Sequence, residues 1–327
     1  MSNSESAPEG KDKQPLSLGE PSAASEPTYM AEYKTIRGKS TVARRLRARY
    51  REKLQARGIK PPPSPPPPLE PILDPLGQEL LDAGGEIISE RYGRWVIKHA
   101  CGTRVTKFPY GGVRPSEVEA LRFVAGHTSI PVPRVYDVGE RHFTMDFIPG
   151  ETVKQAWDRT LSAEDRALVA RQLRDYITQL RAVKSPDGSI CSFGGREVID
   201  NRWTPVKGGP FADEAAYNEF LVSGLREQAA VREMVRAQLR LRADHEIVLT
   251  HGRLDATNII VQPGVGVVGI VGWEDAGYYP EYFELVVIIG GVRCGYYGEL
   301  LNIFPQRYDA EFAVEQVITQ WSKHRWY

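Results

Sequence analysis

The sequence is divided by a proline segment, residues 61–68, that neither a regular helix nor an inner strand can contain. Seven of these eight residues are proline. Proline fixes φ near about −65° and has no backbone N–H to donate, so such a run adopts an extended polyproline conformation. We therefore expect a spacer here, with the folded part of the chain beginning near residue 75.

The residues before this spacer differ in composition from those after it. Residues 1–35 are rich in Ser, Glu, Pro and Lys with few large apolar side chains, so we expect them to be disordered. In residues 41–57, apolar side chains recur every fourth position among many arginines, which predicts a basic amphipathic helix. That helix would suit an acidic partner, a nucleic acid or an anionic lipid surface; the alternative is a solvated tail. We treat residues 1–75 as one region made of a disordered segment, this helix and the polyproline linker.

The overall charge and the cysteines limit the classes of function and the cellular compartment that we expect. The 327 residues include 42 Lys and Arg against 42 Asp and Glu, which argues against wholesale nucleic-acid binding. Cys101, Cys191 and Cys294 are odd in number and too far apart for zinc-ligand spacing, so we expect no disulfide framework and a cytoplasmic or nuclear location. The most apolar stretch, residues 285–291, is far shorter than the ~20 residues of a membrane-spanning helix, and no transmembrane segment is expected.

The folded part alternates strand and helix signals in an order typical of an α+β protein with two layers. Three β-rich runs separated by turn residues, between residues 85 and 108, predict an antiparallel meander. A helix after Pro115 and a long helix after Ser162 follow from their caps and their apolar period. The other predicted strands are 132–138, 142–148, 247–250, 259–262 and 267–271, and the other predicted helices are 213–225, 229–242 and 310–324.

Several phrases carry a family resemblance. They are VRPSEVEALRF (113–123), IPVPRVY (130–136), FIPGET (147–152), HGRLDATN (251–258), GIVGWE (269–274) and WEDAGYYPEY (273–282). In order and spacing, residues 83 to about 300 resemble the aminoglycoside phosphotransferase and choline kinase branch of the protein kinase-like fold, closest to its fungal group. The resemblance implies a bilobal α+β fold, with a small antiparallel-sheet N-lobe at 76–148 and a mainly helical C-lobe at 149–327.

The resemblance also implies roles for individual residues. Lys107 would be the lysine that contacts nucleotide phosphates, and Glu117 its ion-pair partner, with Glu119 as the alternative if the alignment shifts by two residues. The strand at 142–148 would cross between the lobes and offer hydrogen bonds to an adenine. Asn258 would be one ligand of a magnesium ion.

Two positions depart from the family pattern. Arg253 stands where family members carry the aspartate that acts as catalytic base, and Gly272 stands where they carry the metal-binding aspartate. Arginine cannot accept a proton at any working pH, and general-base catalysis is worth about 100- to 10,000-fold. Glycine has no ligand to offer magnesium, which is normally held by carboxylates. Asp255 and Asp275, two and three residues further along, are the candidate substitutes.

These residues favour a pseudokinase of the aminoglycoside phosphotransferase-like family with a binding or scaffolding role. ATP is the cofactor that the resemblance implies, in a site for a nucleotide or small-molecule ligand, whereas magnesium binding is not expected. One alternative is an active ATP-dependent kinase that phosphorylates a hydroxyl of a metabolite by means of Asp255 or Asp275. A second is an interaction protein that acts through its basic, proline-rich N-terminus. His251 is expected to stabilise its loop by hydrogen bonding.

Overall fold

The computed structural model describes residues 74–91, 94–200, 206–225, 229–291 and 303–322. The predicted disordered segment, basic helix and polyproline spacer lie outside these residues. No helix within the described ranges is long and apolar enough to cross a membrane.

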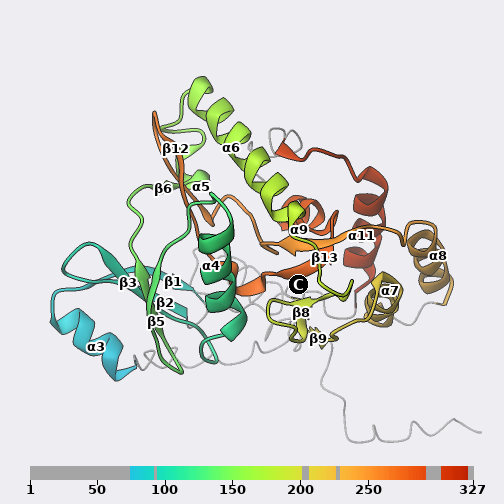
Figure 1. The fold of residues 1–327 in the computed structure, drawn as a ribbon, viewed down its shortest axis with the longest axis horizontal. Helices are drawn as coiled ribbons and strands as arrows, with labels where there is room; N and C mark the ends of the chain where they lie inside the picture. The colour runs from blue at the N-terminus through green and yellow to red at the C-terminus, as the bar shows by residue number, and fades with distance from the viewer. Residues whose placement is uncertain (1–73, 92–93, 201–205, 226–228, 292–302, 323–327) are drawn as a thin grey trace, which may run out of the picture. The chain divides into compact units, whose positions relative to one another are not determined.

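The first part of the fold is a five-stranded antiparallel sheet with strand order β1-β2-β3-β5-β4 (Figure 1). The predicted meander at residues 85–108 is confirmed, since β1 pairs with β2 and β2 with β3, both antiparallel. Pro133 shortens the predicted strand 132–138, because proline cannot donate to a sheet ladder. The strands are β1 (Glu86–Arg91), β2 (Arg94–Lys98), β3 (Arg104–Phe108), β4 (Val135–Val138) and β5 (Phe143–Asp146).

Two helices pack on this sheet. The short helix α3 (Pro75–Asp82), which was not predicted, packs Leu76, Leu80 and Leu81 against the buried Trp95, Ile97 and Phe108 of β2 and β3. The predicted helix after Pro115 is α4 (Pro115–His127), whose buried apolar residues join those of β3 and β5 in the main core. The sheet therefore positions α4, and α4 in turn carries the acidic residues discussed below.

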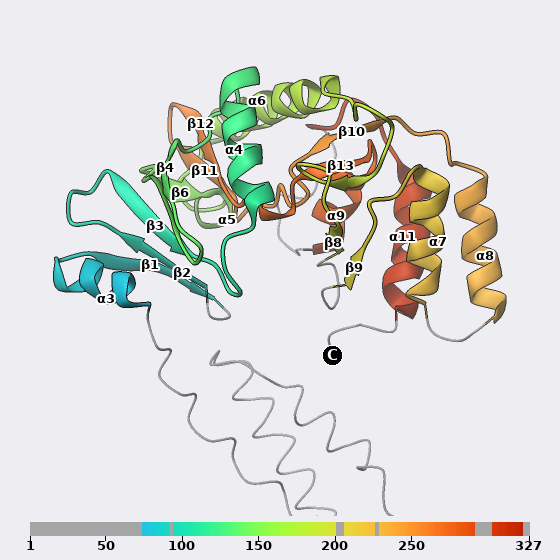
Figure 2. The ribbon, with the colours of Figure 1, turned by 60° about the horizontal axis from the view of Figure 1, so that its bottom comes forward.

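The second part of the fold is mainly helical, with two small three-stranded sheets, β10-β13-β7 and β12-β11-β6. The long helix α6 begins with a capping box between Ser162 and Asp165, and its predicted apolar stripe is buried. Figure 2 shows α7, α8 and α11 side by side. The helices are α5 (Val153–Ala156), α6 (Ala163–Ala182), α7 (Glu214–Ser223), α8 (Ala229–Arg240), α9 (Phe283–Gly291) and α11 (Asp309–Trp321). The strands are β6 (Glu151–Thr152), β7 (Cys191–Ser192), β8 (Val198–Asp200), β9 (Val206–Gly208), β10 (Ile247–Thr250), β11 (Ile259–Gln262), β12 (Gly266–Ile270) and β13 (Gly277–Pro280).

Strand pairing brings two loops of the second part together. Thr250, the last residue of β10, pairs with Gly277 at the start of β13. Ile259, the first residue of β11, pairs with Ile270 at the end of β12. Residues 251–258 and residues 271–276 are therefore each anchored at both ends by the same two strand pairs. The two phrases that depart from the family pattern lie on these facing loops.

A buried ion-pair cluster around His245 ties the helices to the segment before β10. His245 Nδ1 lies 2.9 Å from Glu214 Oε1 on α7, and its Nε2 lies 3.7 Å from Glu311 Oε1 on α11. The imidazole also packs edge-on against Tyr282 at 4.7 Å between ring centroids. Burial alone would lower the pKa of His245, but the hydrogen bond and charge of Glu214, together with Glu311 and Glu281, raise it above its ordinary value.

This cluster predicts that the folded state loses stability in mildly alkaline solution. Because the folded-state pKa of His245 is raised, its contribution is complete below the unfolded value of about 6.5 and is lost as pH rises through the folded pKa. The free energy of unfolding, measured by urea denaturation from pH 5.5 to 9, should fall over that window. His245→Gln should be less stable at low pH and should lack this fall. An equal fall in the variant would assign the effect to another group.

Candidate functional site in the facing loops

His251 and Glu284 hold the backbone of the loop at residues 251–258. The buried His251 ring accepts a hydrogen bond from the Arg253 N–H at Nδ1 (3.1 Å), which leaves Nε2 to donate to the Val271 carbonyl at 3.0 Å. Burial lowers the pKa of His251 to about 4, so the ring is neutral near pH 7. The ring joins the two loops by hydrogen bonds, as predicted from the sequence for a residue that stabilises its loop.

Glu284, on the first turn of α9, was not among the predicted site residues. Its carboxylate is buried and accepts hydrogen bonds from the Gly252 N–H (2.9 Å) and the Leu254 N–H (2.8 Å). Gly252 has φ +77°, and a Cβ there would lie 2.2 Å from the Asp275 carbonyl oxygen, so only glycine fits between the two loops. The loop is thus fixed by its backbone on both sides of Arg253.

Lys107 and Glu117 form a buried ion pair between β3 and α4. Lys107 Nζ lies 2.6 Å from Glu117 Oε1, with the side chains 11% and 2% exposed. Burial would lower the pKa of Lys107, but Glu117 and Glu274 raise it. Burial also raises the pKa of Glu117, against the charge of Lys107; at 2.6 Å we assign the pair as ionised. Glu119, the alternative partner, instead binds Arg196 through both oxygens at 2.7 and 2.8 Å.

Glu274 lies at the centre of the site, and its carboxylate meets basic side chains from three different segments. Arg94 at the start of β2 donates a short hydrogen bond to Oε1, Arg253 Nη1 lies 3.1 Å from the same atom, and Lys107 Nζ lies 3.4 Å from Oε2. Burial alone would raise the pKa of Glu274, but Lys107, Arg94, Arg253 and Arg114 lower it to about 2. The carboxylate is therefore ionised throughout the physiological range.

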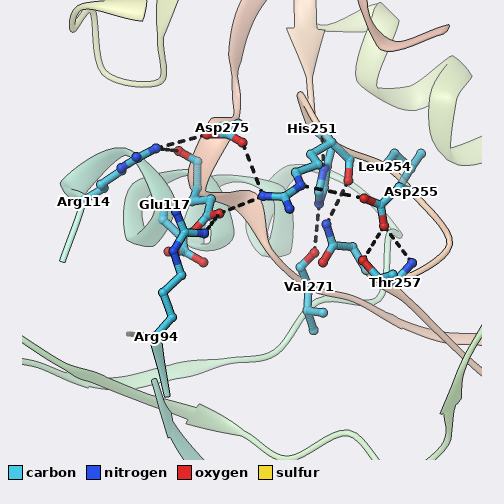
Figure 3. Close-up of polar contacts among 12 residues, drawn as sticks. Arg94, Arg114, Glu117, His251, Leu254, Asp255, Thr257, Val271 and Asp275 are labelled. Atoms are coloured by element: carbon cyan, nitrogen blue, oxygen red, sulfur yellow. Dashed lines mark hydrogen bonds and ion pairs between the residues drawn. The ribbon is translucent and has the colours of Figure 1, made fainter. Parts of the chain in front are cut away.

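The two candidate substitutes for the missing aspartates have different surroundings. Asp275 contacts Arg114 Nη1 at 3.0 Å and Arg253 Nη1 at 4.0 Å, within the cluster drawn in Figure 3. Burial and the charge of Glu274 raise the pKa of Asp275 to about 6. Asp255 accepts hydrogen bonds from the N–H and hydroxyl of Thr257, at 2.7 and 2.5 Å, which closes a tight turn. Asp275 thus lies inside the charged cluster, whereas Asp255 shapes the loop and reaches the cluster only through Arg253 Nε, at 3.7 Å.

The donors around Asn258 and Gly272 do not fit a magnesium site. Asn258 Nδ2 donates to the Arg253 carbonyl at 2.9 Å, and a Cβ on Gly272 would lie 2.7 Å from Asn258 Oδ1. Gly272 has φ +81° and supplies no ligand. Magnesium takes oxygen ligands, usually one or two carboxylates beside the substrate phosphates. Among the described residues no group of three or more His, Cys, Asp or Glu side chains is placed to hold a metal.

The structure thus brings together Lys107, Glu117, Arg253, Asn258, Gly272 and Asp275 and leaves Asp255 at the margin; the chemical roles assigned to them stay predictions. Sequence reasoning missed Arg94, Arg114, Glu274 and Glu284 as site residues. Glu274 and Arg114 stood inside the family phrases, so their position carried a signal. Arg94 and Glu284 carried none, because their partners are distant in sequence.

Comparison with known proteins identifies the family of this chain and solved structures of similar fold. The sequence model described as "Phosphotransferase enzyme family" matches residues 89–326. The chain belongs to this family. Among solved members of similar fold, the ADP-bound aminoglycoside phosphotransferase APH(2'')-Ib shares 16% identity at a TM-score of 0.51, and APH(2'')-IIa in its streptomycin–ATP ternary complex shares 15% at 0.50. Each similarity covers 76% of this chain and 86% of the other. No curated protein matches the sequence.

The expected α+β, protein kinase-like fold is therefore confirmed, together with the resemblance on which it rested. At these identities the solved phosphotransferases establish the fold alone. The chemistry of this phosphotransferase-family chain must therefore be inferred from its own residues.

Proposed function

We propose that this member of the phosphotransferase family is a pseudokinase, which binds a phosphate-bearing ligand but transfers phosphate slowly or not at all. The observation that carries the proposal is the place of Arg253. It occupies the position at which the family resemblance puts the catalytic base, and its guanidinium lies 3.1 Å from Glu274 inside the charged cluster. A guanidinium there cannot accept the proton of an acceptor hydroxyl.

The Lys107–Glu117 ion pair and the nearby arginines support the proposal that a phosphate-bearing ligand still binds. The Lys107–Glu117 ion pair is assembled, and a lysine of this kind acts on phosphates as a point charge. The solved structures of similar fold hold ADP in one case and ATP with streptomycin in the other, so a nucleotide is the first ligand to test. Arg94, Arg114 and Arg253 supply positive charge that elsewhere in the family a metal ion would supply.

The contacts of the two candidate substitutes also favour weak or absent transfer. The Asp255 carboxylate is engaged by Thr257, and the Asp275 carboxylate by Arg114. Moving either group into the vacated position would break these contacts, and a displacement of about 1 Å in a catalytic group can cost about 100-fold in rate. No described contact favours the active-kinase alternative over the pseudokinase.

We expect the purified full chain with ATP and magnesium to release no phosphate above background, with or without hydroxylated metabolites as acceptors. ATP should still raise the melting temperature in EDTA, and magnesium should not enlarge the rise, because protein cations take the place of the metal. Lys107→Ala should remove the rise, whereas Lys154→Ala, an exposed lysine on α5, should preserve it. Robust magnesium-dependent phosphotransfer that is abolished by Lys107→Ala would overturn the proposal.

A further inference from the structure

The charged cluster contains more basic groups around one carboxylate than an ordinary ion pair requires. Arg94, Lys107 and Arg253 reach the Glu274 carboxylate from β2, β3 and the loop after β10. Arg114, from the turn before α4, donates to the Glu274 backbone carbonyl at 3.4 Å and to Asp275 at 3.0 Å. Three neighbouring segments, between residues 94 and 114, and the distant loop after β10 thus direct cationic groups at Glu274 and Asp275.

The three arginines of the cluster are partly exposed, whereas Lys107 and the shared carboxylate are largely buried. The side chains of Arg94, Arg114 and Arg253 are 33%, 28% and 39% exposed, while that of Glu274 is 8% exposed. A solvent-borne anion can therefore meet the three guanidinium groups without first unfolding the site. Figure 3 shows Arg94 and Arg114 approaching this region from different elements, with Asp275 opposite.

The pairing of the local charges leaves no carboxylate for a metal ion that an anion would bring with it. Arg94, Lys107, Arg114 and Arg253 are balanced by Glu117, Asp255, Glu274 and Asp275, to which they are paired. A magnesium ion delivered with a nucleotide would be placed among these guanidinium groups and would find no vacant carboxylate. A bare diphosphate chain instead offers several oxygens to the forked guanidinium donors, which suit phosphate geometry.

We propose that this site takes a metal-free diphosphate or triphosphate group, and that the Glu274 carboxylate occupies the place of its phosphate until the ligand displaces it. The inference rests on the proposed function, since it concerns the binding that remains when transfer is lost. Glu274 is then a specificity-determining residue. It keeps weakly charged anions out and yields to a polyphosphate, which carries more charge and more acceptor oxygens.

This proposal makes Glu274→Gln a gain-of-binding substitution. The amide keeps the size of the side chain but removes the charge that competes for Arg94, Lys107 and Arg253. A unit charge at this range competes strongly with an incoming anion, because partly buried charges are screened little by solvent. We expect at least about tenfold tighter binding of inorganic diphosphate.

The test is calorimetric titration of the full chain with inorganic diphosphate in EDTA at fixed ionic strength, with ADP as a second titrant. Glu274→Gln should bind diphosphate at least about tenfold more tightly than the unchanged protein. Glu119→Gln, which removes a carboxylate paired with Arg196 outside the cluster, should change the affinity less than twofold. Excess magnesium should weaken binding, because it sequesters the titrant. Tighter binding of ADP than of diphosphate would assign the ligand to nucleotides, and equal binding to polyphosphates in general.

Unchanged or weaker diphosphate affinity in folded Glu274→Gln would overturn the inference, as would binding that requires magnesium or no binding by either protein. If Glu274→Gln does not fold, Arg253→Gln decides the question, since its partly exposed side chain lies on the loop surface. We expect that variant to lose at least about tenfold in diphosphate affinity, and an unchanged affinity would overturn the inference. Phosphotransfer by the unchanged protein in magnesium would count against the proposed function alone, because these titrations contain EDTA.

Discussion

Replacing Arg253 and Gly272 together by aspartate is expected to give the protein magnesium-dependent binding of ATP and slow ATP hydrolysis. The unchanged chain should show neither. The two carboxylates would supply the base and the metal ligand that the family resemblance assigns to these positions. Magnesium should then tighten ATP binding by at least about tenfold, which corresponds to about 1.4 kcal/mol.

The geometry around both positions allows this double substitution. Gly272 has φ +81°, in the left-handed region that Asp and Asn enter more readily than other non-glycine residues. The atoms that a new Cβ would meet belong to the side chain of Asn258, which must shift and give up its hydrogen bond to the Arg253 carbonyl, in the aspartate and asparagine variants alike. The loop carrying Arg253 is held by Glu284 and His251 through backbone N–H groups, so the new side chain should leave its path unchanged.

The measurement is calorimetry of ATP binding with magnesium and with EDTA, followed by an assay of phosphate release. The matched control is Arg253→Asn with Gly272→Asn, which has the same side-chain shape and the same backbone preference but no carboxylate. A double-aspartate protein that behaves like the double-asparagine control would show that the site cannot be restored by its two missing ligands. The structural account of the departures would then be wrong.

Trp273→Ala is expected to lower the free energy of unfolding by about 3–5 kcal/mol. The indole is fully buried, donates from Nε1 to the Ile270 carbonyl at 3.0 Å and packs against the His251 ring at 4.5 Å. Its removal leaves a large cavity beside His251, which joins the two loops. Urea denaturation at pH 7 measures the loss.

Leu241→Ala is the control for this substitution, because Leu241 is 74% exposed and its truncation should change stability by less than about 0.5 kcal/mol. A loss below about 1 kcal/mol for Trp273→Ala would mean that the loops do not pack as described. The two variants together separate the burial of Trp273 from a general sensitivity of the second part of the fold.

Local sequence patterns were sufficient to predict those helices and strands that depend on residues close in sequence. The meander at residues 85–108 follows from alternating strands and turns, and α6 from Ser162, Asp165 and a buried stripe. The short strands β6, β7, β8, β9 and β13 were missed. All five are two to four residues long, so they carry little periodicity of their own, and β6, β7 and β13 pair with strands distant in sequence.

The site was predictable only in the part that the family phrases cover. They pointed to Lys107 and Glu117, whose side chains then proved to be 2.6 Å apart. The contact between Arg94 and Glu274 joins residues 180 positions apart, and nothing near Arg94 in the sequence signals it. The contacts of Glu274 with several basic side chains depend on the tertiary structure, which residue type and spacing alone do not reveal.

Glu284 holds the loop by its backbone, and this affects how the site can evolve. Its carboxylate binds the N–H groups of Gly252 and Leu254, on either side of position 253, and the Arg253 side chain takes no part in this anchoring. The identity of the residue at position 253 is therefore uncoupled from the shape of the loop. A mutation there can exchange a basic side chain for an acidic one while the backbone that presents the side chain keeps its place.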